Sequence, residues 1–215
     1  MRVISGWAKG RKLFTPPARD NTIRPTSDRA REALFNIIGK QVRGATVLDL
    51  FAGTGALGVE ALSRGAANVC FVDYLNQALE LINRNVQVCM EALDQNRELL
   101  DQNQISSIPD PFKPVTLIRH DLRRGLPFFS DKLRATPGFD LIFLDPPYSQ
   151  GLSRQLLLAI DTSSTLLREQ TLLVVEDRAR ETLPERLTQL TLVDQRKYGE
   201  AGFWFYQQQP DETSR

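Results

Sequence analysis

The sequence VLDLFAGTGALGVEAL, from Val47 to Leu62, joins an apolar run to a glycine-rich turn and a helical segment. Gly53, Gly55 and Gly58 match the pattern G-x-G-x-x-G, in which missing side chains permit a tight turn and let a ligand lie against the backbone. The next apolar run, NVCFVD, ends at Asp73, 20 residues after Gly53. A carboxylate at that place can accept hydrogen bonds from ribose hydroxyls. The stretch therefore predicts a βαβ unit that binds a nucleoside-bearing cofactor.

Short apolar runs alternate with helical stretches along the rest of the chain. We expect strands within residues 45–51, 68–73, 114–121, 139–145, 171–177, 190–199 and 201–208. Continuous apolar runs spaced by helices are typical of a parallel sheet covered on both faces. A short glycine-containing turn joins the last two runs, which favours an antiparallel hairpin. The predicted fold class is α/β, with a mostly parallel seven-stranded sheet that ends in a C-terminal antiparallel edge hairpin.

Composition sets the broad class of the protein. The 215 residues are 41% hydrophobic and 25% charged, which is usual for one main globular domain. Its two cysteines fall in apolar segments, and two thiols form neither a disulfide framework nor a zinc site. No apolar stretch approaches the roughly 20 residues that span a bilayer, and the amino terminus lacks the apolar core of a signal peptide. We expect a cytoplasmic protein with no membrane partner and no metal site.

The first 43 residues are strongly basic. They hold ten Lys or Arg residues against three acids, a net charge of +7, whereas the remainder of the chain carries −6. This asymmetry indicates a polyanionic partner for the N-terminal region, the alternative being a solvated charged face. Residues 2–14 are typical of a β-hairpin or loop, and Pro16 and Pro17 end regular structure after them.

The segment RPTSDRAREALFNIIG predicts a helix that Thr26 or Ser27 caps and Gly39 ends. Its expected apolar stripe consists of Ala30, Ala33, Leu34, Ile37 and Ile38, which leaves Arg29, Arg31 and Glu32 largely off the core. Farther along, the polar stretch from Leu93 to Pro114 predicts a helix extension followed by a surface loop.

Two carboxylates bear on which cofactor the glycine-rich turn binds. A dinucleotide needs a helix N-terminus that holds pyrophosphate, whereas S-adenosylmethionine has no phosphate and carries a sulfonium and an α-amino group. Asp49 places a negative charge near those cations, and the same charge would oppose pyrophosphate. Asp121, at the end of VTLIRHD, can accept from an adenine amino group, the alternative being an ordinary loop acid. These acids favour S-adenosylmethionine over NAD.

A second stretch, FDLIFLDPPYSQG from Phe139 to Gly151, ends an apolar run in an acid, two prolines and a tyrosine. The prolines remove two consecutive backbone donors, so the chain leaves the sheet there in a rigid turn. Asp145 and Tyr148 then lie where ligands bind in open α/β sheets. The alternative is a proline-rich strand exit with a packed tyrosine.

Together, DLFAGTG and DPPY resemble class I S-adenosylmethionine-dependent methyltransferases that modify exocyclic amines of nucleobases. RVISGWAKGRKL, IRPTSDRAREALFN, LDLFAGTGALGVEALSRGA and KYGEAGFWFY further resemble the bacterial ribosomal RNA small-subunit methyltransferase D family. The resemblance implies a Rossmann-like methyltransferase that modifies a guanine N2 of 16S rRNA. We also expect the rRNA to be part of a small-subunit ribosomal particle and the protein to be a monomer, with free RNA as the alternative substrate. This chain has Asp73 where the family more often has Glu, and it is longer over residues 88–114 than the family leads us to expect.

The sequence assigns three sets of candidate site residues. The catalytic set is Asp145, Pro146 and Tyr148, which would hold a flipped base; the cofactor set is Asp49, Phe51, Gly53, Gly55, Asp73 and Asp121; and the nucleic-acid set is Lys9, Arg11, Lys12, Arg24, Arg29 and Arg31, with Trp7 as a possible stacking group. We expect an RNA-binding extension over residues 1–43, a methyltransferase domain over 44–208 and a disordered tail over 209–215.

Three alternative functions stay open at this point. The first is methylation of another nucleobase amine, such as adenine N6, in RNA or DNA. The second is a nucleic-acid-binding protein on the same fold that performs no chemistry. The third, an NAD-dependent oxidoreductase, is disfavoured by Asp49 and gives the DPPY turn no task.

Overall fold

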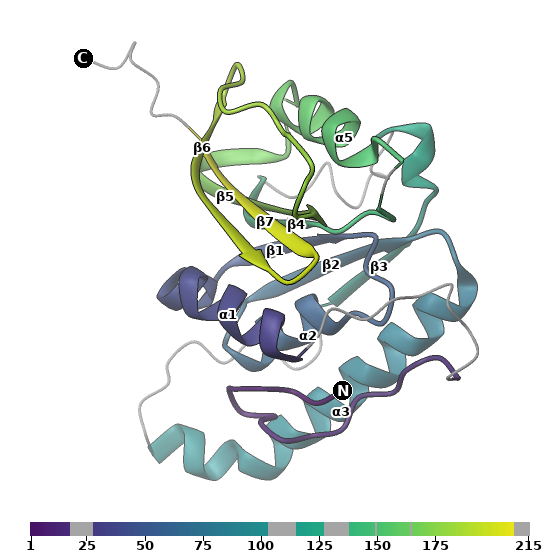
Figure 1. The fold of residues 1–215 in the computed structure, drawn as a ribbon. Coiled ribbons are helices and arrows are strands. Elements are labelled where there is room, and N and C mark those ends of the chain that lie inside the picture. The colour runs from purple at the N-terminus through teal and green to yellow at the C-terminus, as the bar shows by residue number, and fades with distance from the viewer. Residues whose placement is uncertain (18–27, 103–114, 127–137, 149, 164, 209–215) are drawn as a thin grey trace. The chain divides into compact units, whose positions relative to one another are not determined.

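The computed structural model describes residues 1–17, 28–102, 115–126, 138–148, 150–163 and 165–208, except for the side chains of residues 96–102 (Figure 1). The expected helix caps Thr26 and Ser27, Arg24, the loop before Pro114 and the tail over 209–215 lie outside the described residues. The chain divides into two compact units, Met1–His120 and Asp121–Arg215, which are described in turn.

Parallel strands form the sheet of the first unit. β1 (Thr46–Leu50) pairs with β2 (Asn68–Asp73), and β2 pairs with β3 (Val115–Arg119). The side chains of β1 and β2 are almost all buried, because these runs are apolar on both faces of the sheet. Asp49 lies near the end of β1 and Asp73 ends β2, so both acids lie at the carboxyl edge of this sheet.

The helices of the first unit follow one another in the order that the sequence predicts. They are α1 (Asp28–Ile38), the 3₁₀ turn η1 (Gly39–Val42), α2 (Ala56–Ser63) and α3 (Asn76–Gln102), and α2 and α3 pack on the sheet of this unit. α3 is 27 residues long, which confirms the expected helix extension as far as Gln102. In Figure 1 the N-terminal segment, in purple, lies beside α3, and backbone atoms of Phe14 are bonded to Asn85 on that helix.

The buried face of α1 differs from the predicted stripe. It consists of Ala30, Arg31, Leu34, Phe35 and Ile38. Ile37 is 38% exposed, so its expected place in the core is wrong. Arg31, expected off the core, is fully buried because it has acidic partners there, whereas Arg29 and Glu32 are exposed as predicted.

The second unit carries the other strands. It contains η2 (Leu122–Arg124), β4 (Phe139–Leu144), α5 (Leu152–Asp161), β5 (Leu167–Arg178), β6 (Leu190–Tyr198) and β7 (Ala201–Gln208). β4 and β5 are parallel, and β7 pairs antiparallel with both β5 and β6. The predicted C-terminal hairpin is therefore confirmed, with β6 at its outer edge.

Both units contain parallel strands with helices between them, and the described residues form seven strands that are mostly parallel, so the α/β fold class is confirmed. The N-terminal hairpin is short: Arg2 and Lys12 form a single antiparallel bridge, and the Val3 amide donates to the Arg11 carbonyl at 3.0 Å. Among the described helices, none combines the length and apolar character needed to cross a bilayer.

Candidate active site

The glycine-rich turn after β1 has the backbone geometry that its sequence requires. Gly53 and Gly55 have φ angles of 56° and 74°, in the left-handed region that glycine tolerates best. Phe51 also has a positive φ, 58°, which is uncommon for a residue with a side chain. A Cβ on Gly58 would lie 2.2 Å from the ring of Phe71, so Gly58 serves the packing of α2 on β2.

Asp73 is bound to this turn through both carboxylate oxygens. Oδ2 accepts from the Gly53 amide at 2.9 Å, and Oδ1 accepts from the Leu75 amide at 3.0 Å. The side chain is nearly buried, at 7% exposure. A carboxylate has about four lone-pair positions, so Asp73 can also accept from the hydroxyls of a ribose. The turn and Asp73 together fit the nucleoside part of a cofactor.

Asp49 is buried beneath the same turn. Its Oδ2 accepts from the Gly58 amide at 2.9 Å. Burial raises the pKa of Asp49 to about 8; the Gly58 hydrogen bond lowers it, and the negative charge of Asp73 raises it. Burial therefore favours the protonated form of Asp49 in the absence of a ligand, and the expected contact of its negative charge with the cations of a cofactor stays a prediction.

A buried side-chain amide connects the glycine-rich turn to the basic N-terminal loop, residues 2–14. Asn85 on α3 donates from Nδ2 to the Thr54 carbonyl at 2.8 Å and to the Phe14 carbonyl at 3.1 Å. Its Oδ1 accepts from the Phe14 amide at 2.7 Å, and the residue is fully buried. One side chain thus holds both the glycine-rich turn and the end of the basic loop.

Asp121 begins η2 in the second unit. Its Oδ1 accepts from the Arg123 amide at 3.2 Å and from Arg123 Nε at 2.7 Å, while Oδ2 accepts from Nη2 at 2.9 Å. These bonds to Arg123 lower the pKa of Asp121, so its carboxylate is ionised. In the structure Asp121 caps a 3₁₀ turn, and its contact with an adenine amine stays a prediction.

The DPPY turn follows the buried strand β4. Asp145 is partly buried, Pro146 is buried and Pro147 is exposed. The hydroxyl of Tyr148 donates to Glu176 Oε1 at 2.9 Å, and Glu176, near the end of β5, is 5% exposed. The hydrogen bond to Glu176 therefore fixes the position of the Tyr148 hydroxyl, and Asp145 and Pro146 precede this tyrosine by three and two residues in the same turn.

Most of the predicted nucleic-acid residues that the structure describes are accessible. Lys9, Arg11 and Lys12 are exposed on the N-terminal loop, and Arg29 is exposed on α1. Arg11 also bonds through Nη2 to Gln95 Oε1 of α3.

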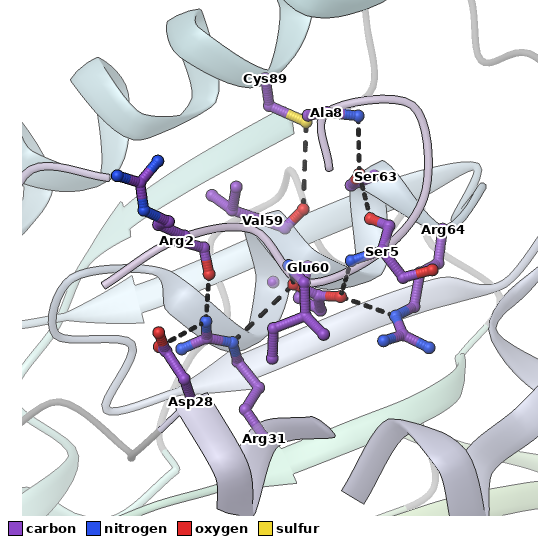
Figure 2. A network of polar contacts seen from close by, with 12 residues as sticks. Arg2, Ser5, Ala8, Asp28, Arg31, Val59, Glu60, Ser63, Arg64 and Cys89 are labelled. Atoms are coloured by element: carbon purple, nitrogen blue, oxygen red, sulfur yellow. Dashed lines mark hydrogen bonds and ion pairs between the residues drawn. The ribbon is translucent and has the colours of Figure 1, made fainter. Parts of the chain in front are cut away.

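Arg31 cannot contact phosphate in this structure, which corrects its predicted role. Its side chain has no exposure, because it is enclosed by Asp28 at 3.0 Å, by Glu60 Oε2 at 3.8 Å and by the carbonyl oxygen of Arg2 (Figure 2). Arg64 contacts the other oxygen of Glu60 at 2.7 Å. The guanidinium of Arg31 thus holds the N-terminal loop and α1 to α2.

The N-terminal loop docks on α2 through backbone contacts. Glu60 accepts from the amides of Ile4 at 2.8 Å and Ser5 at 3.0 Å, and Ser63 Oγ accepts from the Ala8 amide at 3.0 Å (Figure 2). A Cβ on Gly6 would lie 1.7 Å from the Ser63 carbonyl oxygen. Only glycine at position 6 permits this approach, so the loop that carries Lys9, Arg11 and Lys12 has a defined position on α2.

Comparison with known proteins identifies the family. Residues 1–207 match the family described as Conserved hypothetical protein 95. The chain belongs to this family. YlbH of Bacillus subtilis, described provisionally as an rRNA methyltransferase, is 35% identical over 206 residues, 96% of this chain and 98% of YlbH. Ribosomal RNA small subunit methyltransferase D of Haemophilus influenzae is 29% identical over 209 residues, 96% of this chain and 93% of that protein.

A solved structure of a family relative supports the fold. The yhhF protein of Escherichia coli, described provisionally as a methyltransferase, has a TM-score of 0.67 and 26% identity, with 98% of this chain and 99% of that chain covered. The expected Rossmann-like class I architecture and the resemblance to the small-subunit methyltransferase D family are thus both confirmed.

Asn85 and Glu176 were not among the residues predicted from the sequence. Asn85 lies three residues after Ile82 and four before Cys89 on the buried face of α3, so a polar residue on an apolar stripe was the available signal. Glu176 follows an apolar run in TLLVVED, and an acid at the carboxyl end of a strand was the signal there. Within the described part of the chain, no cluster of His, Cys, Asp or Glu could hold a metal ion.

Proposed function

We propose that this family member is an S-adenosylmethionine-dependent rRNA methyltransferase whose substrate is the exocyclic N2 amine of a guanine in 16S rRNA. The observation that carries the proposal is the end of β4, where the half-buried Asp145 and the buried Pro146 follow an apolar strand and Tyr148 is fixed by Glu176. The names of its curated relatives, rRNA methyltransferases, support the substrate class.

The cofactor set fits S-adenosylmethionine. Asp73 would accept from the ribose hydroxyls, the Gly53 and Gly55 turn would admit the backbone contact, and Asp121 would accept from the adenine amine. Asp49 would become ionised beside the cations of the bound cofactor, because an opposite charge favours the charged form of a carboxyl. When bound, S-adenosylmethionine supplies a methyl group: the electron pair of the breaking S–C bond goes to sulfur while the amine nitrogen forms the new C–N bond.

The DPPY residues would prepare the amine for that reaction. The lone pair of an exocyclic purine amine is delocalised into the ring, which makes the nitrogen a poor nucleophile. Asp145 and the Pro146 carbonyl would accept its two N–H groups and hold the nitrogen toward the methyl group, while Tyr148 stacks on the flipped base. On methylation the amine loses one proton. Asp145, which accepts a hydrogen bond from the amine, would pass this proton to solvent water. Positioning and the field of the carboxylate would supply most of the catalysis.

The basic loop would hold the RNA. Lys9, Arg11 and Lys12 share one docked segment, and Arg29 adds a cation at the start of α1. Phosphate contacts from such residues give affinity without sequence selectivity. We propose that the substrate is a small-subunit ribosomal particle and that the protein acts as a monomer.

The test is methyl transfer from labelled S-adenosylmethionine to small-subunit particles from a strain that lacks this activity. We expect one labelled nucleotide in 16S rRNA, which nucleoside digestion identifies as N2-methylguanosine. Asp145→Ala should abolish transfer while the affinity for S-adenosylhomocysteine, measured by calorimetry, stays within a few-fold. Labelled N6-methyladenosine would replace the proposed target, and no label in particles or free rRNA would contradict the proposed function.

A further inference from the structure

Two carboxylates lie near the carboxyl ends of neighbouring strands of the second unit, Asp145 just after β4 and Glu176 two residues before the end of β5. β4 and β5 pair in parallel, and their register sets Leu144 beside Val175. The next residue in the chain after each of these is an acid, Asp145 after Leu144 and Glu176 after Val175. Because paired residues of parallel strands advance together, these two acids lie side by side at the carboxyl edge of the sheet.

The position of Glu176 is fixed at the DPPY turn. Tyr148 Oη donates to Glu176 Oε1 at 2.9 Å, and only 5% of Glu176 is exposed. Tyr148 belongs to the turn that contains Asp145 and Pro146, so Glu176 contacts the same turn from the adjacent strand. A carboxylate has about four lone-pair positions, which is more than the bond from Tyr148 uses.

We propose that Glu176 is a specificity-determining residue that selects guanine by accepting the N1–H of the base. The inference rests on the proposed function, in which Asp145 and the Pro146 carbonyl accept the two N–H groups of the N2 amine. Guanine presents N1–H directly beside that amine, so its three adjacent donors would face acceptors from the turn after β4 and from β5.

The same arrangement rejects the other bases that carry an exocyclic amine. Beside its amine, adenine presents N1 and cytosine presents N3, and each of these is an acceptor. In its proposed role Glu176 offers lone pairs to the base, so adenine or cytosine would place two acceptors against each other and leave the nearly buried Glu176 without the base donor. A site built to bond one donor discriminates strongly against a base that lacks it.

The experiment compares Glu176→Gln with Glu169→Gln in the particle assay. Glu169 lies on the same strand β5 and is exposed, so it controls for the loss of one carboxylate from that strand. We expect Glu176→Gln to lower kcat/KM for N2-methylguanosine formation roughly 10- to 100-fold, the effect of one hydrogen bond to a charged group. Affinity for S-adenosylhomocysteine should stay within about twofold of wild type, and Glu169→Gln should leave kcat/KM unchanged.

Tyr148→Phe distinguishes two roles of Glu176, namely contact with the base and support of the Tyr148 ring through its hydroxyl. It removes the hydroxyl and keeps Glu176, so it should lose less kcat/KM than Glu176→Gln. Wild-type kcat/KM in Glu176→Gln, or equal losses in both variants, would overturn the inference. If Glu176→Gln does not fold, Glu176→Asp takes its place: its shorter carboxylate should lower kcat/KM with S-adenosylhomocysteine affinity kept, and an unchanged kcat/KM overturns the inference. A wild-type product other than N2-methylguanosine would instead refute the proposed function.

Discussion

Asn85 and Thr54 are joined by a buried hydrogen bond of 2.8 Å that ties α3 to the glycine-rich turn. The same amide holds both backbone polar groups of Phe14. A fully buried asparagine with three such bonds is costly to replace, because each group that loses its partner stays out of water. The turn and the end of the basic loop therefore depend on one side chain.

Replacing Asn85 should destabilise the protein and weaken cofactor binding together. We expect Asn85→Ala to lower the free energy of unfolding by about 2–4 kcal/mol, since it strands buried backbone groups of Phe14 and Thr54. Urea unfolding measures the stability, and calorimetry with S-adenosylhomocysteine measures the affinity. Asn83→Ala, an exposed asparagine two residues earlier, is the control and should change stability by no more than about 0.5 kcal/mol. Equal stability of the two variants would contradict the role of the bridge.

The raised pKa of Asp49 predicts a pH dependence of stability. Its pKa is about 8 in the folded protein and 3.8 in the reference state, so between these values the folded state binds a proton that the unfolded state has lost. The contribution of Asp49 to stability therefore falls as pH rises through this window, by up to about 1.4 kcal/mol per pH unit. Asp49→Asn removes this titration and still offers an oxygen to the Gly58 amide.

Urea unfolding of both proteins between pH 5 and pH 8.5 checks this prediction. Asp49→Asn should gain stability over wild type as pH rises. Asp94→Asn, at an exposed aspartate on α3, controls for the loss of one negative charge. A stability difference between Asp49→Asn and wild type that does not change with pH would show that Asp49 is ionised in the folded protein throughout this range.

The buried pair of Arg31 and Glu60 predicts a strong effect of charge removal. Glu60→Gln leaves the fully buried guanidinium of Arg31 without that carboxylate, which should lower the free energy of unfolding by about 3–5 kcal/mol. The double variant Arg31→Met with Glu60→Gln should recover part of the loss, because the fully buried guanidinium of Arg31 is then removed as well; Arg64 loses its partner in both variants. Thermal unfolding of the three proteins measures both effects, and a double variant less stable than Glu60→Gln would count against this explanation.

Local patterns predicted the elements of the fold well. The strand, turn and helix of residues 47–62 and the acid that ends β2 could be read from the sequence, because apolar runs and glycine spacing are local signals. The β6–β7 hairpin followed from a short turn between two runs for the same reason. The DPPY turn was found because two prolines must end a strand.

The environment of single polar residues could not be predicted in this way. Arg31 was expected off the core because it lies outside the apolar stripe of its helix, and its buried partner Glu60 comes from another helix, 29 residues later. The charge of Asp49 depends on desolvation by neighbours that folding brings together. Glu176 meets Tyr148 only through the pairing of β4 with β5. Tertiary contacts decide all three.

The close packing of Gly6 against α2 predicts which glycine of the basic loop matters for RNA binding. Gly6 and Gly10 have nearly the same φ, 83° and 84°, but a Cβ on Gly6 would lie 1.7 Å from the Ser63 carbonyl oxygen, and a Cβ on Gly10 has nothing within 4 Å. Gly6→Ala and Gly10→Ala should both show the backbone cost of a left-handed residue, roughly 1–2 kcal/mol, whereas only Gly6→Ala displaces the loop. Filter binding to 16S rRNA over a salt series should show a flatter salt slope for Gly6→Ala, by up to about one unit for each phosphate that the displaced loop no longer binds. Equal slopes for the two variants would show that RNA binding does not depend on the docked position of Lys9, Arg11 and Lys12.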